Sequence, residues 1–299
     1  MIGLEPHLIL RTKRANTVES KKDEDAFGYV GNILFDRMAG ATIHTCTPGE
    51  YGRVGSEALT EALCEDLESI VDEKKQKKVY QIPVGGSNGL GTWGYIEAVD
   101  EFMHQFDKDD EKIDHVVFAC GSGGTATGIG LGLALAYREN NNIDDVPNIH
   151  AVGVCDYPDY FYEKITSIAK EMGLDMSSIL PGSEEVGATC DTSIEDFVRD
   201  HMTVHQGKGL GYSSSTSEEL DFIVKFALET GISLDPVYSG KALFQFMKEV
   251  KDNPESYRNT RVLFWHTGGS LGNYEKIEAF SDTLQSVSPV RRMNVYGKK

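Results

Sequence analysis

Residues 118–132 read FACGSGGTATGIGLG, and this stretch decides the fold class of the 299-residue chain. A short apolar run leads into a glycine turn, which leads into an alternating series of small and apolar residues. That order is typical of a strand, a tight turn and the start of a helix. Glycines let the backbone approach a ligand closely, and the N–H groups of a helix start favour a phosphate. The sequence therefore predicts an anion site on this turn, with added hydroxyl donors from Ser122 and Thr125.

Other interpretations of the turn remain open from the residues alone. No lysine follows the glycines, which disfavours the P-loop of nucleoside triphosphate-binding proteins. The spacing of Gly121, Gly123 and Gly128 is not a strict G-x-G-x-x-G, although it leaves a dinucleotide site open. A tight strand–helix turn that binds nothing is the remaining alternative.

Composition excludes several classes of partner. Asp and Glu number 47 against 29 Lys and Arg, which gives a net charge of -18 and disfavours nucleic acid and membrane surfaces as partners. The five cysteines are widely spaced and form no C-x-x-C pair, so we expect no metal site and no disulfide framework. We find neither a long apolar span nor a signal peptide, and we expect a cytoplasmic protein.

Short β-rich runs alternate with longer helical patterns along most of the chain. This alternation predicts a parallel sheet with helices on both faces, a three-layer αβα arrangement. Helical spacing covers 56–71, 91–102 and 218–229, whereas the weak apolar pattern of 181–208 predicts irregular surface. The predicted strands are 7–11, 41–46, 79–83, 115–120, 150–155 and 261–266.

Two further small-residue turns follow predicted strands, PVGGSN at 83–88 and HTGG at 266–269. An open α/β sheet binds its ligands at the carboxyl ends of its strands, so three such turns together indicate a ligand site. Tyr238, in LDPVYSGK, and Tyr212, in GLGYSSS, are loop phenols that could donate or accept a proton at such a site. Each could equally pack as an amphipathic side chain with its hydroxyl in water.

Taken together, these segments resemble the D-cysteine desulfhydrase and 1-aminocyclopropane-1-carboxylate deaminase family. The matching pieces occur in the family's order from residue 3 to about residue 270. They are GLEPHLILRT, GNILFDRMAGA, PVGGSNGLGTWGYIEA, FACGSGGTATG, LDPVYSGKA and LFWHTGG. The resemblance implies a pyridoxal 5'-phosphate enzyme of the two-lobed, tryptophan synthase β-like fold (fold type II). It also implies a homodimer that acts on a small amino acid.

The resemblance also implies roles for individual residues. Tyr238 and Tyr212 would lie at the substrate as catalytic groups, and Thr267 would face the pyridine nitrogen. The phosphate cradle would be formed by Gly121, Ser122, Gly123, Gly124 and Thr125. The substrate cleft would be lined by Gly85, Gly86, Ser87, Asn88 and Ser239.

One position bears on the substrate. The deaminase-type members carry Glu after the tyrosine of the D-P-V-Y segment, and this chain carries Ser239. The resemblance therefore favours α,β-elimination of D-cysteine to pyruvate, sulfide and ammonia. A 1-aminocyclopropane-1-carboxylate deaminase-like enzyme is the alternative.

The family's Schiff-base lysine lies upstream of the G-L-x-x-x-L-I-L-R-T strand, in a G-N-K-x-R-K-L-E segment, and a G-G-x-Q-S-N-H segment follows it. Neither segment occurs in the 299 residues, and Lys241 belongs to the D-P-V-Y segment instead. Without the lysine, the resemblance implies that the chain is inactive.

We therefore expect an N-terminally incomplete product of a desulfhydrase gene, with residues 1–88 a remnant of the small lobe and 89–299 the large lobe. If a targeting segment were lost with the upstream region, the protein could reside in an organelle instead. The alternatives are a short protein that binds pyridoxal phosphate or phosphate without catalysis or pairs with another chain, an unrelated nucleotide-binding protein, and an enzyme active on another amine.

Overall fold

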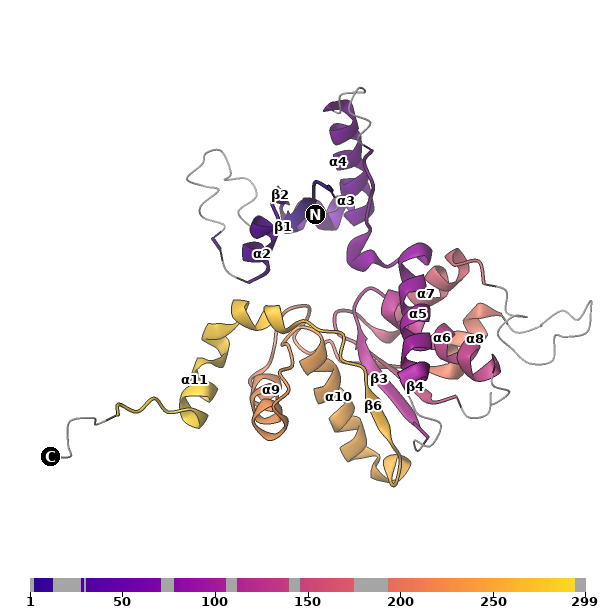
Figure 1. Ribbon diagram of the computed structural model, residues 1–299, viewed down its shortest axis with the longest axis vertical. Coiled ribbons are helices and arrows are strands. Elements are labelled where there is room, and N and C mark those ends of the chain that lie inside the picture. The colour runs from indigo at the N-terminus through magenta and orange to yellow at the C-terminus, as the bar shows by residue number, and fades with distance from the viewer. Residues whose placement is uncertain are drawn as a thin grey trace, which may run out of the picture.

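The computed structural model describes residues 3–12, 28–29, 31–70, 78–105, 112–139, 146–174 and 193–293. Two separate parallel sheets occur in these residues (Figure 1). The first pairs β1 (His7–Arg11) with β2 (Thr42–Cys46). The second has the strand order β5-β4-β3-β6, with β3 (His115–Cys120), β4 (Asn148–Gly153), β5 (Met202–Gln206) and β6 (Val262–Phe264). The predicted boundary near residue 88 stays a prediction.

Within the described residues, the N-terminal part carries three helices beside its two strands. They are α2 (Asn32–Met38), α3 (Pro48–Val54) and α4 (Ser56–Ile70). A capping box between Thr47 and Glu50, with Pro48 in the first turn, explains why α3 begins where it does. The described residues before Val99 contribute a single buried apolar side chain, Cys46, so this part packs loosely.

The four-stranded sheet is covered on both faces, which gives the predicted three layers (Figure 1). One face packs against α5 (Gly89–Gln105), α6 (Gly124–Glu139), α7 (Pro158–Glu171) and α8 (Ile194–His201). The other face packs against α10 (Ser239–Asp252), which in turn packs on α9 (Ser217–Thr230). Helix α11 (Ile277–Val287) packs on α9 through Phe280. Short 3-10 turns complete the described part, η3 (Val84–Gly86), η6 (Pro254–Tyr257) and η7 (Ser270–Glu275).

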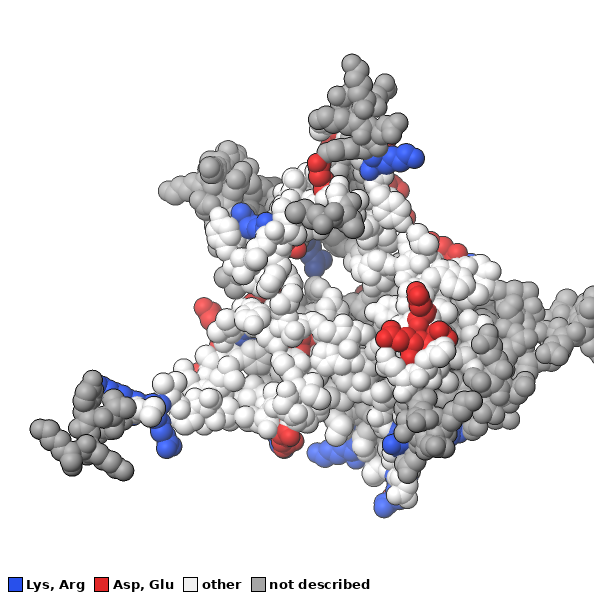
Figure 2. All heavy atoms as spheres, in the orientation of Figure 1, with Lys and Arg blue, Asp and Glu red and all other residues white. Residues whose placement is uncertain are grey.

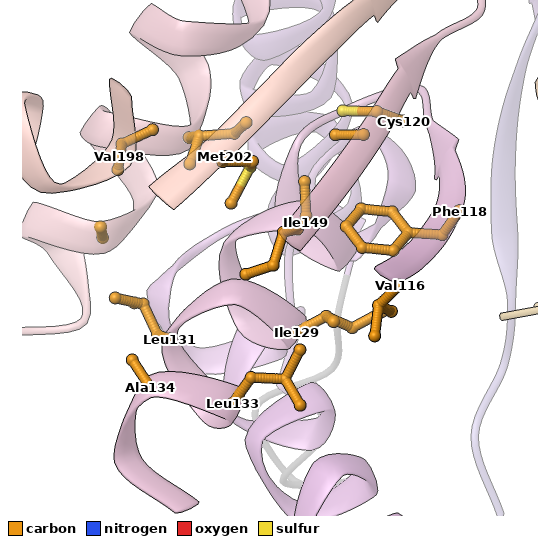
Figure 3. Close-up of a cluster of buried hydrophobic side chains, with 14 of the residues drawn as sticks. Val116, Phe118, Cys120, Ile129, Leu131, Leu133, Ala134, Ile149, Val198 and Met202 are labelled. Carbon is orange, nitrogen blue, oxygen red and sulfur yellow. The ribbon is translucent and has the colours of Figure 1, made fainter. Parts of the chain in front are cut away.

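Alternation along β3 explains how one strand serves two cores. Val116, Phe118 and Cys120 are fully buried toward α6, whose Ile129 and Leu133 meet them (Figure 3). The intervening Val117 joins the opposite cluster beneath α10. Since side chains of a strand point to alternate faces, a strand covered on both faces reads as a continuous apolar run, as the sequence of β3 does.

Helix α6 accounts for the alternating glycines of the opening stretch. A Cβ on Gly132 would lie 2.9 Å from Val99 Cγ2 of α5, and one on Gly128 would lie 2.9 Å from the Thr92 carbonyl oxygen. Residues four apart share a helix face, so these two glycines allow α5 and α6 to approach closely. Their conformational cost in a helix is therefore offset by packing.

Two predictions about secondary structure are wrong. Residues 79–83 form no strand, because Tyr80 and Ile82 are exposed and no described strand lies beside them. The segment 181–208 is not all irregular surface, since its described part contains α8 and the sheet strand β5. Met202 and Val204 are the buried side chains of β5, and two residues at a spacing of two are too short a pattern to stand out. Residues 181–192 lie outside the described residues.

Charge is spread thinly on the face of the molecule drawn in Figure 2. Most of the visible described surface is uncharged, the basic atoms form small groups that lie apart from one another, and one group of acidic atoms lies near α5. Within the described ranges, no helix has both the length and the apolar character to cross a membrane.

Candidate functional site

The predicted site residues follow strands that end at one edge of the four-stranded sheet. Residues 121–125 follow β3, the segment with Tyr212 follows β5, and Thr267 follows β6. All neighbouring strands pair in parallel, so these carboxyl ends lie on the same side. This is the edge at which α/β sheets bind ligands.

The glycine turn leaves little room for side chains at two positions. A Cβ on Gly124 would lie 2.7 Å from Ser87 Oγ, and one on Gly121 would lie 3.0 Å from Tyr238 Cε1. Gly123 has a φ of 98°, which favours glycine. Because α6 begins at Gly124, its first N–H groups lack partners within the helix and point out of its positive end. The turn therefore presents donors to an anion.

Ser87 connects the 83–88 segment, which contains Gly85 and Gly86, to the glycine turn at 121–125. Its hydroxyl lies 2.6 Å from Ser122 Oγ and accepts a hydrogen bond from the Gly124 N–H at 3.2 Å. Gly85 and Gly86 of η3 have φ values of 71° and 62°, which turn the chain toward this contact. The Ser87 hydroxyl oxygen thus accepts a hydrogen bond at the start of α6. A helix start of this kind also suits a phosphate oxygen.

Asn88 has a different local role. Its Oδ1 accepts a hydrogen bond from the Gly91 N–H at 2.8 Å and so caps the first turn of α5. The predicted cleft residues 85–88 therefore divide into Ser87, which contacts the turn, and Asn88, which starts a helix. Their contact with a substrate stays a prediction.

The two predicted tyrosines lie together. Tyr212 Oη and Tyr238 Oη are 3.0 Å apart, although the residues are 26 positions apart in sequence. Burial is the main cause that raises the pKa of Tyr238, and the hydrogen bond with Tyr212 raises it further. Since the Tyr238 ring also covers Gly121, the phenol pair adjoins the glycine turn.

Asp235 is a site residue to which the sequence pattern assigned no role. Its carboxylate accepts backbone N–H bonds from Val237, Tyr238 and Ser239 at 2.8, 2.9 and 2.7 Å, and the side chain is 1% exposed. A Cβ on Gly269 would lie 2.8 Å from Asp235 Cγ. Asp235 therefore links the backbone of Tyr238 to the turn that contains Thr267. The preference of Asp for helix starts is the signal that could have revealed it.

Ser239 and Thr267 differ in their surroundings. Ser239 is 3% exposed, and its hydroxyl donates to Asp235 Oδ1 at 2.7 Å and accepts from the Asp235 N–H at 2.9 Å. Its hydroxyl therefore has structural partners, and its predicted place in the cleft gains no support from this geometry. Thr267 lies in an exposed turn before Gly268 and Gly269, and its role toward a pyridine nitrogen stays a prediction.

Two thiols lie behind the turn. Cys155 Sγ donates to the Gly121 carbonyl at 3.2 Å, and Cys120 is fully buried. Burial, with a smaller effect of Cys155, raises the pKa of Cys120 to about 12. Burial is also the main cause that raises the pKa of Cys155. Both groups therefore stay protonated at neutral pH and are unsuited to nucleophilic chemistry.

Comparison with known proteins identifies the family. Residues 14–268 match the family model described as pyridoxal-phosphate dependent enzyme. This chain belongs to the pyridoxal-phosphate dependent enzyme family. Members of the family use pyridoxal phosphate, and the glycine turn, with little room for side chains at Gly121 and Gly124 and with Ser87 and Ser122 beside it, fits the phosphate of that cofactor.

Relatives in this family carry one or both of two activities in their names. The mitochondrial bifunctional D-cysteine desulfhydrase/1-aminocyclopropane-1-carboxylate deaminase of Arabidopsis thaliana is 42% identical over 296 residues, 98% of this chain and 64% of that protein. A putative 1-aminocyclopropane-1-carboxylate deaminase of Thermotoga maritima is 35% identical over 90% of this chain and 71% of the relative. The D-cysteine desulfhydrase of Klebsiella pneumoniae is 30% identical over 66% of this chain and 52% of the relative. The chain thus spans less than two thirds of the length of the Arabidopsis protein.

A solved structure confirms the predicted fold class. The crystal structure of a 1-aminocyclopropane-1-carboxylate deaminase homologue superposes with a TM-score of 0.66 at 25% identity, over 94% of this chain and 70% of that chain. The three-layer α/β architecture and the type II fold of pyridoxal-phosphate enzymes are therefore those of this chain.

Proposed function

We propose that these residues form the phosphate-binding and proton-transfer part of a D-cysteine desulfhydrase-type site. The observation that carries the proposal is the phenol pair, Tyr212 and Tyr238, 3.0 Å apart and adjoining the glycine turn. The reaction would be α,β-elimination of D-cysteine to pyruvate, sulfide and ammonia.

The glycine turn would hold the cofactor by its phosphate. The Gly124 N–H already donates to Ser87 Oγ, so the donors for the phosphate would be the next N–H groups of α6 and the hydroxyls of Ser87, Ser122 and Thr125. Pyridoxal phosphate, when bound, supplies a ring that accepts the electron pair left when the α-proton of an amino acid is removed. Thr267 would lie toward the nitrogen of that ring, where a hydroxyl withdraws electrons less strongly than a carboxylate.

Tyr238 would donate a proton to the leaving thiolate. Its raised pKa keeps the phenol protonated at neutral pH, which suits a donor to a departing thiolate. Tyr212 would accept or return that proton across the short Oη–Oη contact. Its exposed side chain gives the pair a route to solvent.

The residue after Tyr238 favours the desulfhydrase over the deaminase. Ser239 has no charge, and its hydroxyl already has Asp235 as its partner. The chain therefore offers two phenols at this point and no carboxylate in the position of the deaminase-type Glu. Both activities appear in the name of the Arabidopsis relative, so a deaminase-like activity is the second candidate.

The test has two parts. The purified chain, titrated with pyridoxal phosphate, should show saturable quenching of protein fluorescence. After borohydride treatment, peptide mapping should find no lysine adduct, because the G-N-K-x-R-K-L-E segment is absent from the sequence. A specific adduct on one lysine would contradict the expected inactivity of this chain.

The second part adds the G-N-K-x-R-K-L-E segment, which does not occur in the 299 residues. The chain fused behind the corresponding N-terminal region of the Arabidopsis relative should release pyruvate from D-cysteine at least about tenfold faster than from L-cysteine, a difference of about 1.4 kcal/mol in barrier. Release of 2-oxobutyrate from 1-aminocyclopropane-1-carboxylate as the faster reaction would favour the deaminase. Binding without turnover in the fusion would favour a non-catalytic phosphate-binding protein. The fusion's mass in solution would test the homodimer that we also propose.

A further inference from the structure

A buried lysine lies beside the turn that precedes Tyr212. Lys241, in the first turn of α10, is 0% exposed. Its Nζ donates to the carbonyl oxygens of Lys208 and Gly211, at 2.8 and 3.2 Å. Glu219 Oε2 lies 3.8 Å from the same nitrogen. The three hydrogens of the ammonium thus face two backbone oxygens and one carboxylate.

Both carbonyls belong to the turn that leads to Tyr212. This turn has unusual backbone conformations, with φ of 54° at Gly209 and 118° at Gly211. A Cβ on Gly209 would lie 2.7 Å from Glu219 Oε1 and 3.2 Å from Lys241 Nζ, so the turn is wrapped closely around the ion pair. Because the Tyr212 side chain is 48% exposed, packing alone holds it weakly.

Glu219 is itself fixed in place. It is 4% exposed and forms a capping box with Thr216, whose N–H donates to Glu219 Oε2 at 2.8 Å. Burial lowers the pKa of Lys241, Glu219 opposes this, and Lys276 adds to the lowering. A buried ion pair is a weak source of stability, and its best-attested use is to specify one arrangement over others.

The rest of the segment is held by other groups. Lys276 Nζ donates to the Ser213 carbonyl at 2.7 Å, and Ser215 Oγ donates to the Pro236 carbonyl at 2.9 Å. These contacts fix the chain after Tyr212. The chain before Tyr212 is the part whose carbonyls converge on Lys241.

We propose that Lys241 is a positioning residue, which fixes the 208–211 turn so that the Tyr212 phenol reaches the Tyr238 phenol. This proposal rests on the proposed function in one respect, because that function gives the two phenols their chemical role. The geometry that Lys241 would impose can be measured without cofactor or substrate.

The experiment follows both phenols by ¹⁹F NMR of the full chain labelled with 3-fluorotyrosine. The variants Tyr212→Phe and Tyr238→Phe assign the two resonances, and Tyr212→Phe gives the shift of Tyr238 without its partner. In Lys241→Met, the Tyr238 resonance should move to the position seen in Tyr212→Phe. The matched control is Lys248→Met, on the same helix but exposed, which should leave both resonances unchanged.

Removal of Lys241 alone leaves Glu219 buried without its cation and could prevent folding. The double variant Lys241→Met/Glu219→Gln removes both charges, and the same loss of the Tyr212-dependent shift is expected. If Tyr238 keeps its wild-type resonance in either folded variant while only the melting temperature falls, Lys241 is structural and the proposal is wrong. Failure of the elimination assay would leave this result unaffected.

Discussion

At the scale of single residues, Gly124 shows why the glycine turn leaves little room for a side chain. Its N–H donates to Ser87 Oγ, and a Cβ would lie 2.7 Å from that oxygen and 3.1 Å from Ser87 Cβ. A side chain at this position must therefore push Ser87 away from the start of α6.

We expect Gly124→Ala to raise the dissociation constant for pyridoxal phosphate about tenfold, about 1.4 kcal/mol, because Ser87 must move away from the helix start. Fluorescence quenching measures this constant. Gly94→Ala is the control, since a Cβ there meets nothing within 4 Å. Equal affinity in both variants would show that Ser87 and the turn do not cooperate in binding.

Asp235 is the residue on which the Tyr238 segment depends most. Replacement by Asn keeps the size and removes the charge that accepts three backbone N–H groups and the Ser239 hydroxyl. We expect Asp235→Asn to lower the free energy of unfolding by about 2 kcal/mol, in the range of hydrogen bonds to a buried charged group. Urea denaturation measures it. The exposed Asp282→Asn should change stability by less than about 0.5 kcal/mol.

At the scale of elements, the packing of α5 on α6 depends on small residues that also lower helix propensity. Gly132→Ala would place a methyl group 2.9 Å from Val99 Cγ2, and overpacking of this kind costs roughly 1–3 kcal/mol. We expect that loss in thermal or urea unfolding. Adding Val99→Ala should recover part of this lost stability. The double variant should therefore be more stable than the sum of the two single-variant losses predicts. Strict additivity would show that the two helices do not meet at these residues.

The elements also show which sequence signals were sufficient. Strand 115–120 was predicted with its observed ends, because its apolar run is continuous and a glycine turn ends it. The predicted helices 56–71, 91–102 and 218–229 all occur, within three residues of the observed ends. Strand β5 was missed because it offers only Met202 and Val204 to the core and takes its hydrogen bonds from β4, which is distant in sequence.

At the scale of the whole molecule, a chain of histidines crosses the sheet beneath α10. His115 Nδ1 lies 3.0 Å from His150 Nε2, and His150 Nδ1 lies 2.8 Å from His205 Nε2. Tyr257 and Phe246 pack on these rings. Desolvation, followed by the effects of His205 and His115, lowers the pKa of His150 to about 3. The pKa values of His115 and His205 are also lowered by burial, against opposing effects of Asp114 and Glu249.

The sign of the pH effect follows from these shifts. Between about pH 6.5 and pH 3, the unfolded chain binds a proton on His150 that the folded chain does not. We expect the free energy of unfolding to fall on acidification through this range, by up to about 1.4 kcal/mol per pH unit from His150. The lowered pKa values of His115 and His205 act in the same direction. Urea unfolding at a series of pH values measures it. His150→Leu should show a shallower dependence than wild type, and the exposed His104→Gln should match wild type. Parallel curves for His150→Leu and wild type would contradict the assignment.

The sequence by itself determined the α/β class, the glycine turn and the identity of the two phenols, because these depend on local backbone chemistry and on residue type. Only the tertiary structure decided that Ser87 meets Ser122, that Tyr212 meets Tyr238, and that the buried Lys241 binds the carbonyls of Lys208 and Gly211. Those contacts join residues 35, 26 and 30 or more positions apart. The geometry of these contacts is set by the order in which the strands pair and by where α10 packs on the sheet. No local sequence pattern encodes either.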